Sequence, residues 1–176
     1  MNFKEQLLAE LSKRNTDYIA SVIGNDKQLF KQMIQLLLSN ENLISGRAAW
    51  VVETIWLKYP FMIDPYINDL IDFLPKSKYD SQKRHIAKIL SNRNLRELDE
   101  ERLGILIDRC FTWLEDPVYP PAVKVYSMQI IYNYIEIEPV LAKELIAIIE
   151  NQYNDSTPGF KNRGDKLLKK LYKLIN

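Results

Sequence analysis

The chain has 176 residues, of which 47% are hydrophobic, and its 24 basic and 23 acidic side chains leave a formal net charge of +1. This length is typical of a single domain with a sizeable core, and the composition excludes a disordered chain, a collagen and a disulfide-stapled miniprotein. The near-neutral charge argues against a general polyanion-binding protein, although it permits a local basic patch.

Apolar residues recur with the period of an α-helix along the whole chain. In chain order, the predicted helices cover residues 3–11, 18–23, 27–38, 47–58, 65–74, 79–92, 100–114, 121–136, 139–153 and 160–176. Residues 15–17 are a predicted N-cap for the second helix and residues 25–26 for the third, while residues 99–101 place carboxylates in the first turn of the seventh. Gly24 and Pro75 mark helix ends.

Residues 135–138 alternate like a strand, but this segment is only four residues long and Pro139 closes it. We expect about ten helices with short connections, forming one domain over residues 1–176. The longest uncharged apolar stretch, Val125 to Ile135, is shorter than the roughly 20 residues of a membrane-spanning helix. The first residues also lack the basic and apolar regions of a signal peptide. We therefore expect a soluble, cytoplasmic protein without membrane attachment.

The even-numbered predicted helices resemble one another. Four of them carry a basic residue near the start, followed by apolar residues at helical spacing. These basic residues are Arg47, Arg84, Lys124 and Arg163, which lie 37, 40 and 39 residues apart. A period of about 40 residues with two helices in each unit is typical of a helical solenoid.

This pattern resembles the HEAT repeat family over approximately residues 26–176. In that family the second helix opens with Arg or Lys, a small residue follows three positions later, and a turn containing Asp precedes it. Ala87 and Ser127 occupy the small-residue position in two units, whereas Trp50 and Lys166 replace it in the first and last. The Asp residues of the preceding turns are Asp80, Asp116 and Asp155. The resemblance implies an all-α fold, a right-handed α-α superhelix of about ten helices in five hairpins, with the second helices lining its concave face.

Two predicted helices suit particular positions in such a stack. Residues 47–58 are apolar on nearly every side, and a helix of this kind must be covered by several neighbours. The last helix, residues 160–176, has one leucine stripe with Lys and Arg elsewhere, as a terminal helix with one wet face requires. We expect residues 160–176 to form a C-terminal capping helix and residues 1–24 a degenerate N-terminal capping pair.

Groups that could carry chemistry are scarce. His85 is the only histidine, and we expect it on the solvated or groove side of its helix as a surface or capping residue, with a groove contact or catalysis as alternatives. The only cysteine, Cys110, is expected to be a buried apolar side chain rather than a reactive thiol. One His and one Cys nearly exclude a zinc site, and the five glycines form no nucleotide-binding loop. The sequence therefore predicts no enzyme, no metal and no cofactor.

Charge is segregated along the chain, although the total is nearly zero. Residues 81–96 carry +5, residues 97–116 carry −5 and residues 158–176 carry +5. One interpretation is a set of solvated helix faces with weak local ion pairs. The other is a groove that recognises a charged partner.

The candidate binding residues on the concave face are Arg47, Trp50, Arg84, His85, Lys124, Tyr126 and Arg163. Each basic member either pairs with an Asp of the adjacent turn or contacts an acidic peptide or a phosphate backbone. Tyr126 either packs between repeats or acts as a binding hot spot. We predict a non-enzymatic interaction module that binds a protein or peptide partner on its concave face. The alternative is nucleic-acid binding through the basic residues, as in HEAT-like DNA-repair proteins.

Overall fold

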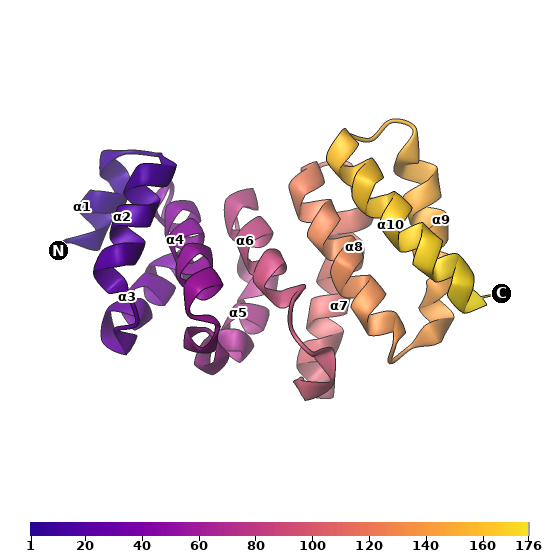
Figure 1. Cartoon of the computed structure of the whole chain (residues 1–176), viewed down its shortest axis with the longest axis horizontal. Helices are drawn as coiled ribbons and strands as arrows, with labels where there is room; N and C mark the ends of the chain where they lie inside the picture. The colour runs from indigo at the N-terminus through magenta and orange to yellow at the C-terminus, as the bar shows by residue number, and fades with distance from the viewer. Residues whose placement is uncertain (176) are drawn as a thin grey trace. The chain divides into compact units, whose positions relative to one another are not determined.

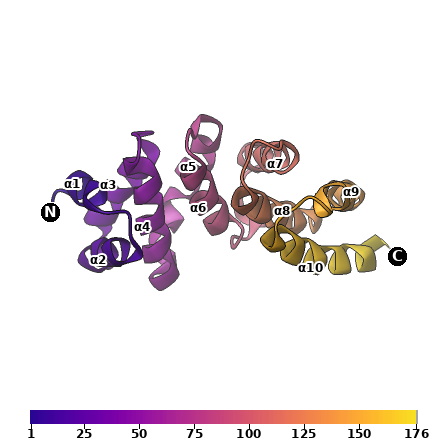
Figure 2. The same ribbon diagram turned by 90° about the horizontal axis from the view of Figure 1, so that it is seen from above.

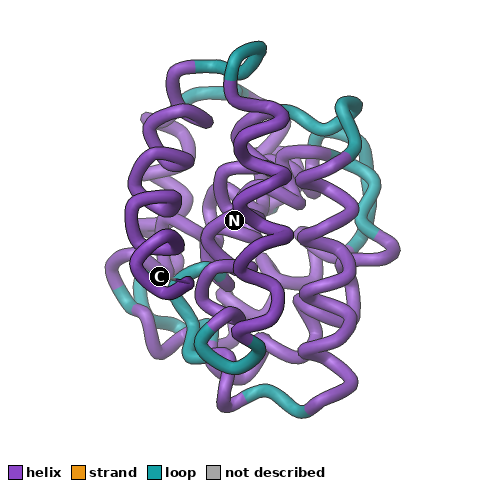
Figure 3. The backbone as a smooth tube through the Cα atoms, turned by 90° about the vertical axis from the view of Figure 1, so that its right-hand side faces the viewer, coloured by secondary structure: helices purple, strands orange, loops and turns teal. Residues whose placement is uncertain are grey.

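The computed structural model describes residues 1–175, and these residues form ten α-helices, five short 3₁₀ segments and no strand (Figure 1, Figure 3). They divide into two compact units, the first comprising Met1–Ile89 and the second starting at Leu90. The alternative of a strand at residues 135–138 is wrong, because α8 ends at Ile135 and the backbone N–H groups of Ile137 and Glu138 both donate to the carbonyl of Tyr134.

The first unit consists of two layers of helices: α1, α3 and α5 lie in one layer, and α2, α4 and α6 in the other (Figure 2). Its elements are α1 (Phe3–Ala9), α2 (Lys13–Ile23), α3 (Lys27–Leu38), α4 (Ile44–Lys58), η1 (Pro60–Met62), η2 (Asp64–Tyr66), α5 (Ile67–Phe73), η3 (Leu74–Lys76) and α6 (Asp80–Leu90), whose last residue belongs to the second unit. The helix expected over residues 65–74 thus begins and ends as 3₁₀ helix, with a short α-helix between.

The second unit repeats this arrangement, with α7 and α9 in one layer and α8 and α10 in the other (Figure 2). Its elements are η4 (Leu95–Glu97), α7 (Glu100–Glu115), α8 (Pro121–Ile135), η5 (Pro139–Leu141), α9 (Ala142–Tyr153) and α10 (Pro158–Ile175). Within this unit α8 packs against α7, α9 and α10, so it is the central helix of the unit.

Several helix starts follow from local side-chain chemistry, as expected. Asp26 caps α3 by accepting hydrogen bonds from the backbone N–H groups of Gln28 (2.8 Å) and Leu29 (3.0 Å). Asp99 caps α7 by accepting from the N–H of Arg102 at 2.9 Å. A carboxylate at this position satisfies N–H groups that have no partner inside the helix and complements the positive end of the helix dipole.

The first helix pair differs from its sequence-based prediction. Ser12, not a residue of the 15–17 segment, caps α2, and Leu11 lies outside α1 with 66% of its surface exposed. Asn15 is instead buried, where its side-chain amide donates to the carbonyl groups of Gln6 and Glu10. The Asn15 side chain therefore satisfies carbonyl groups at the C-terminal end of α1, and Ser12 caps α2 in its place.

The central helix of the first unit is α4, which packs against α1, α2 and α3. This confirms that a helix apolar on nearly all sides needs several neighbours. The helix begins three residues earlier than predicted, because Leu43 adopts φ +61° and ψ −43° and the chain enters the helix at Ile44. Ala48, Val52 and Ile55 are among its fully covered side chains.

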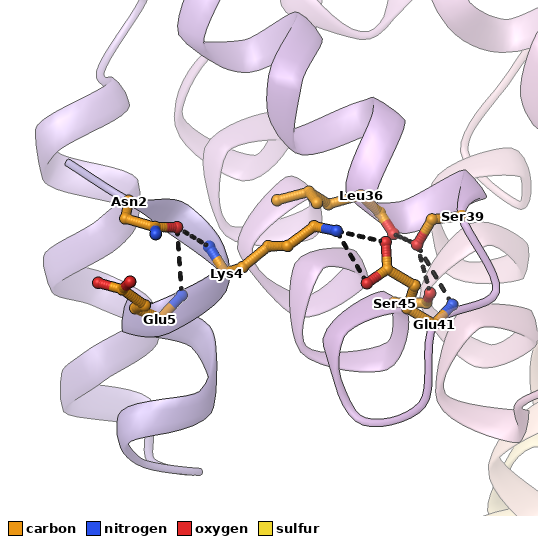
Figure 4. A network of polar contacts seen from close by, with 7 residues as sticks. All are labelled: Asn2, Lys4, Glu5, Leu36, Ser39, Glu41 and Ser45. Carbon is orange, nitrogen blue, oxygen red and sulfur yellow. Dashed lines mark hydrogen bonds and ion pairs between the residues drawn. The ribbon is translucent and has the colours of Figure 1, made fainter.

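A charged contact fixes the N-terminal helix to the α3–α4 connection (Figure 4). The ammonium group of Lys4 reaches both carboxylate oxygens of Glu41, at 2.7 and 2.9 Å. Asn2 caps α1 beside it by accepting from the backbone N–H groups of Lys4 and Glu5. Both side chains of the ion pair are about half exposed, so the pair contributes little stability, about 0–1 kcal/mol, and mainly sets the position of α1.

The last helix, α10, has one buried stripe formed by Phe160, Gly164, Leu167 and Leu171 against α8 and α9. The predicted leucine stripe included Leu174, but this residue is 60% exposed, so the buried stripe ends before it. The capping roles of residues 1–24 and 160–176, and the folding of residues 1–176 as one domain, stay predictions.

Candidate binding surface

The structure brings three of the predicted binding residues together in the first unit. The indole of Trp50 on α4 stacks on the imidazole of His85 on α6, with ring centroids 6.4 Å apart and an interplanar angle of 15°. Arg84, the neighbour of His85, is exposed, and its guanidinium lies 2.8 Å from the His85 Nε2. Trp50 is partly exposed. The Trp50 ring and the Arg84 guanidinium therefore both contact His85 where α4 and α6 adjoin.

The expectation that His85 is a surface residue is wrong, because only 3% of its surface is exposed. Guanidinium groups only donate hydrogen bonds, so Arg84 donates to Nε2 and the imidazole proton lies on Nδ1, which donates to a carboxylate oxygen of Glu53. Burial lowers the pKa of His85 below its ordinary value, although the contact with Glu53 acts in the opposite direction. The imidazole is therefore neutral at pH 7 and cannot serve as a cationic contact.

Glu53 is a site residue that sequence reasoning missed. Burial opposes its ionisation, but the hydrogen bonds from His85 and Lys88 outweigh that effect and lower the pKa of the carboxyl. The carboxylate contacts the neutral imidazole of His85 and is the counter-ion of Lys88 on α6. A signal was present in the sequence: Glu53 is the only charged residue between Ala48 and Leu57. A lone charge in an apolar helix must find a buried partner.

The other basic candidates are engaged with neutral oxygen atoms rather than with Asp side chains. Arg47 donates to the backbone carbonyl of Leu7 at 2.6 Å, and Arg163 donates to the side chain of Gln129 at 2.5 Å. Lys124 is buried and donates to the Gln152 side chain at 2.7 Å. Burial lowers the pKa of Lys124, and the charge of Asp116 partly opposes this. These three residues link helices within their units.

Arg47 illustrates how neighbouring helix pairs are joined. The last carbonyl groups of a helix have no partner inside it, and here side chains from a following helix pair donate to them. Within the first unit Gln82 donates to Leu37, and within the second Gln152 donates to Leu114. Asn133 donates to Ser91 in the same way, whereas Arg96 donates from an earlier segment to Glu136 at the end of α8. Part of the polar pattern along the repeat therefore stabilises the stacking itself.

Two further features belong to the second unit. Tyr126 is half-buried on α8. On α10, exposed lysines occupy the side opposite the buried stripe. They are Lys166, Lys169, Lys170 and Lys173. The ammonium group of Lys170 lies 5.4 Å from the ring centre of Tyr132, so the basic side of α10 reaches an aromatic ring of α8.

Few side chains in the described residues could support catalysis or bind a metal ion. No group of three or more His, Cys, Asp or Glu side chains that could hold a metal ion occurs within residues 1–175. Cys110 is fully buried as predicted, and burial raises the pKa of its thiol, although a contact with Ser127 opposes the shift. None of the helices in this range is long and apolar enough to cross a membrane.

Comparison with known families places this geometry in context. The HEAT repeat domain family matches residues 3–171, and the chain belongs to this family. No curated protein and no solved structure matches the chain. The predicted all-α fold of the HEAT-like α-α solenoid class is confirmed. HEAT repeats are typically non-catalytic and commonly mediate interactions between proteins.

Proposed function

We propose that this chain is a non-enzymatic HEAT-repeat module that binds a protein or peptide partner on the concave face lined by its second helices. The observation that carries the proposal is the joining of Trp50, His85 and Arg84 where α4 and α6 adjoin. Arg and Trp are enriched among residues that dominate binding energy at protein interfaces. The imidazole of His85 contacts both Trp50 and Arg84 and is itself held by Glu53, so the site is organised before a partner arrives.

The charge of this surface favours an acidic partner segment. Arg84 is exposed, and Lys88 beside Glu53 keeps 31% of its side chain accessible. The carboxylate of Glu53 is engaged by His85 and Lys88. With a neutral His85, the side chains of Arg84, Lys88 and Glu53 together carry a charge of +1. Carboxylates of the partner would therefore meet Arg84, while an apolar side chain would lie on the indole of Trp50.

The test compares three forms of the full chain as immobilised baits in a native lysate of the source cells. They are the wild type, Arg84→Glu and the control Lys143→Glu, which reverses an exposed charge on α9. Quantitative mass spectrometry measures each captured protein. We expect a partner that the wild type and Lys143→Glu capture equally and that Arg84→Glu captures at least about fivefold less.

A second variant keeps the test informative if charge reversal acts at long range. Trp50→Ala removes the aromatic surface without altering charge, and it should weaken the capture of the same partner. Circular dichroism at increasing temperature establishes that each variant is folded. The proposal fails if no protein is enriched by the wild type, or if neither variant changes the capture of any enriched protein.

The exposed lysines of α10 support a second candidate function, the binding of a nucleic acid. Lys166, Lys170 and Lys173 share one side of this helix, and a phosphate backbone could contact them. A fluorescent duplex titrated with the full chain at several salt concentrations would show log affinity falling with log salt, with a slope of about −0.9 for each phosphate contact. Absence of binding at low salt would end this alternative.

A further inference from the structure

The first unit also contains a pocket of about 110 Å³ that is separate from the Trp50 surface. It lies between α3 and the connection from α4 to α5. The residues that line it are Lys27, Phe30, Phe61, Met62, Pro65 and Tyr66. The volume far exceeds one water molecule, and a cavity of roughly 150 Å³ is known to hold a benzene ring. The pocket therefore has the size of one aromatic or branched aliphatic side chain.

Aromatic rings form most of the pocket wall. Phe30 is fully buried at its base and meets Tyr66 edge to face, with ring centroids 5.8 Å apart and planes at 64°. Phe61 keeps 54% of its surface exposed at the pocket. The ring of Phe61 is therefore not packed into the core but lies at the opening of the pocket. An incoming apolar side chain would bury surface of both Phe61 and Tyr66.

The charges around this pocket are mainly positive. Lys27 lines the opening, and α3 carries Lys27 and Lys31 with no acidic residue. On the other side, the ammonium group of Lys58 lies 5.3 Å from the ring centre of Tyr59, which in turn meets Phe61 edge to face.

Two acidic residues lie near the pocket in sequence, and both are already engaged. The carboxylate of Asp26 caps α3, and Asp64 takes part in another interaction. Within residues 1–175, by contrast, no hydrogen bond or ion pair engages the ammonium group of Lys27. The ammonium group of Lys27 is therefore available to pair with a carboxylate of a partner.

We propose that this pocket is a docking site for a partner segment in which one aromatic or branched aliphatic residue is flanked by Asp or Glu. The apolar side chain enters between Phe61 and Tyr66, and a flanking carboxylate pairs with Lys27. The lysines exclude a cationic guest such as a methylated lysine, which an aromatic pocket without them would accept. This site needs neither Trp50 nor Arg84, so it can be tested independently of the function proposed above.

The methionines allow a direct test on the full chain, because Met62 lines the pocket and Met128 lies in the second unit. The chain is labelled with ¹³C at its methionine methyl groups and titrated with three acetylated, amidated peptides: Gly-Glu-Phe-Glu-Gly, Gly-Glu-Ala-Glu-Gly and Gly-Lys-Phe-Lys-Gly. We expect the first peptide to shift the Met62 signal in a saturable way and to leave the Met128 signal in place. The alanine and lysine peptides should bind at least about fivefold more weakly.

Variants of exposed side chains assign the contacts without disturbing the core. Phe61→Ala should weaken binding of the first peptide more than about fivefold, while Leu57→Ala, an equally exposed apolar residue of α4, should not. Lys27→Gln should weaken it about two- to fivefold and reduce its salt dependence, while Lys143→Gln should have no effect.

Three results would overturn the proposal. The first is a Met62 signal that none of the peptides shifts, and the second is equal binding of the glutamate and lysine peptides. The third is a response only to a phenylalanine peptide with a free C-terminal carboxylate, which would make the pocket a reader of chain ends instead.

Discussion

Glu53 is the residue whose replacement tests the site most directly. Its carboxylate accepts a hydrogen bond from His85 Nδ1 and pairs with Lys88, and the side chain is only 10% exposed. Glu53→Leu introduces an apolar side chain of similar size and removes both acceptor oxygens. Glu53→Gln keeps one oxygen that can accept from His85, but it removes the charge and replaces the oxygen that Lys88 contacts with an amide nitrogen.

The expected loss of stability follows from the contacts that each variant removes. In Glu53→Leu the buried N–H of His85 loses its acceptor, which costs about 1–3 kcal/mol. Lys88 is 31% exposed, so the loss of its ion pair adds only about 0–1 kcal/mol. We expect a total loss of about 1–4 kcal/mol for Glu53→Leu and a smaller loss, about 1 kcal/mol, for Glu53→Gln.

Urea unfolding followed by tryptophan fluorescence measures these values, because Trp50 stacks on His85. The matched control is Asp69→Asn, which removes an exposed carboxylate from α5 and should change stability by less than about 0.5 kcal/mol. Our account of the cluster is refuted if Glu53→Leu is as stable as the wild type, or if Glu53→Gln is the less stable of the two.

Three other predictions follow from buried groups and close contacts. Because burial lowers the pKa of His85, the unfolded chain binds a proton below about pH 6.5 that the native imidazole does not, so unfolding free energy should fall as the pH drops from about 6.5 towards 5. In urea titrations across this range His85→Gln should flatten the fall, and an unchanged slope would contradict the assignment. A Cβ at Gly46 would lie 2.1 Å from the Ser81 Oγ, so Gly46→Val should lower the unfolding free energy by about 1–3 kcal/mol. Gly104 has open space around it within α7, so Gly104→Ala should instead raise the unfolding free energy by about 0.5–1 kcal/mol. Urea unfolding measures both variants, and stability changes of the same sign and size at the two glycines would contradict this reasoning. The Cys110 thiol should react with a disulfide reagent only at the rate of unfolding, and rapid modification of the native chain would show that it is accessible.

Local sequence chemistry predicted most helices because the signals act over one turn. Asp26 and Asp99 satisfy N–H groups two or three residues away, so their capping role can be read without the tertiary structure. The first helix pair offered two capping candidates of equal intrinsic quality. Ser12 caps α2 because Asn15 is drawn into the end of α1 by contacts with Gln6 and Glu10. No local pattern distinguishes these two outcomes.

The basic repeat positions show the same division between local and tertiary information. Their spacing indicated the stacking period correctly, but their partners lie 28 to 40 residues away in sequence for Arg47, Lys124 and Arg163. The acceptors are a helix-end carbonyl and two side-chain amides, and nothing in the surrounding residues distinguishes these from an Asp. Arg84, which resembles the other three in sequence, is exposed and donates to the imidazole of its neighbour His85 instead of to a distant residue.

The sequence by itself determined the all-α class and the two-helix period, because helical periodicity and capping are properties of neighbouring residues. Only the tertiary structure decided which polar side chains are engaged and which remain exposed. A buried carboxylate such as Glu53 selects partners from another helix according to packing distance and desolvation. As a result, His85 is buried and stacks on Trp50, whereas Arg84 is exposed.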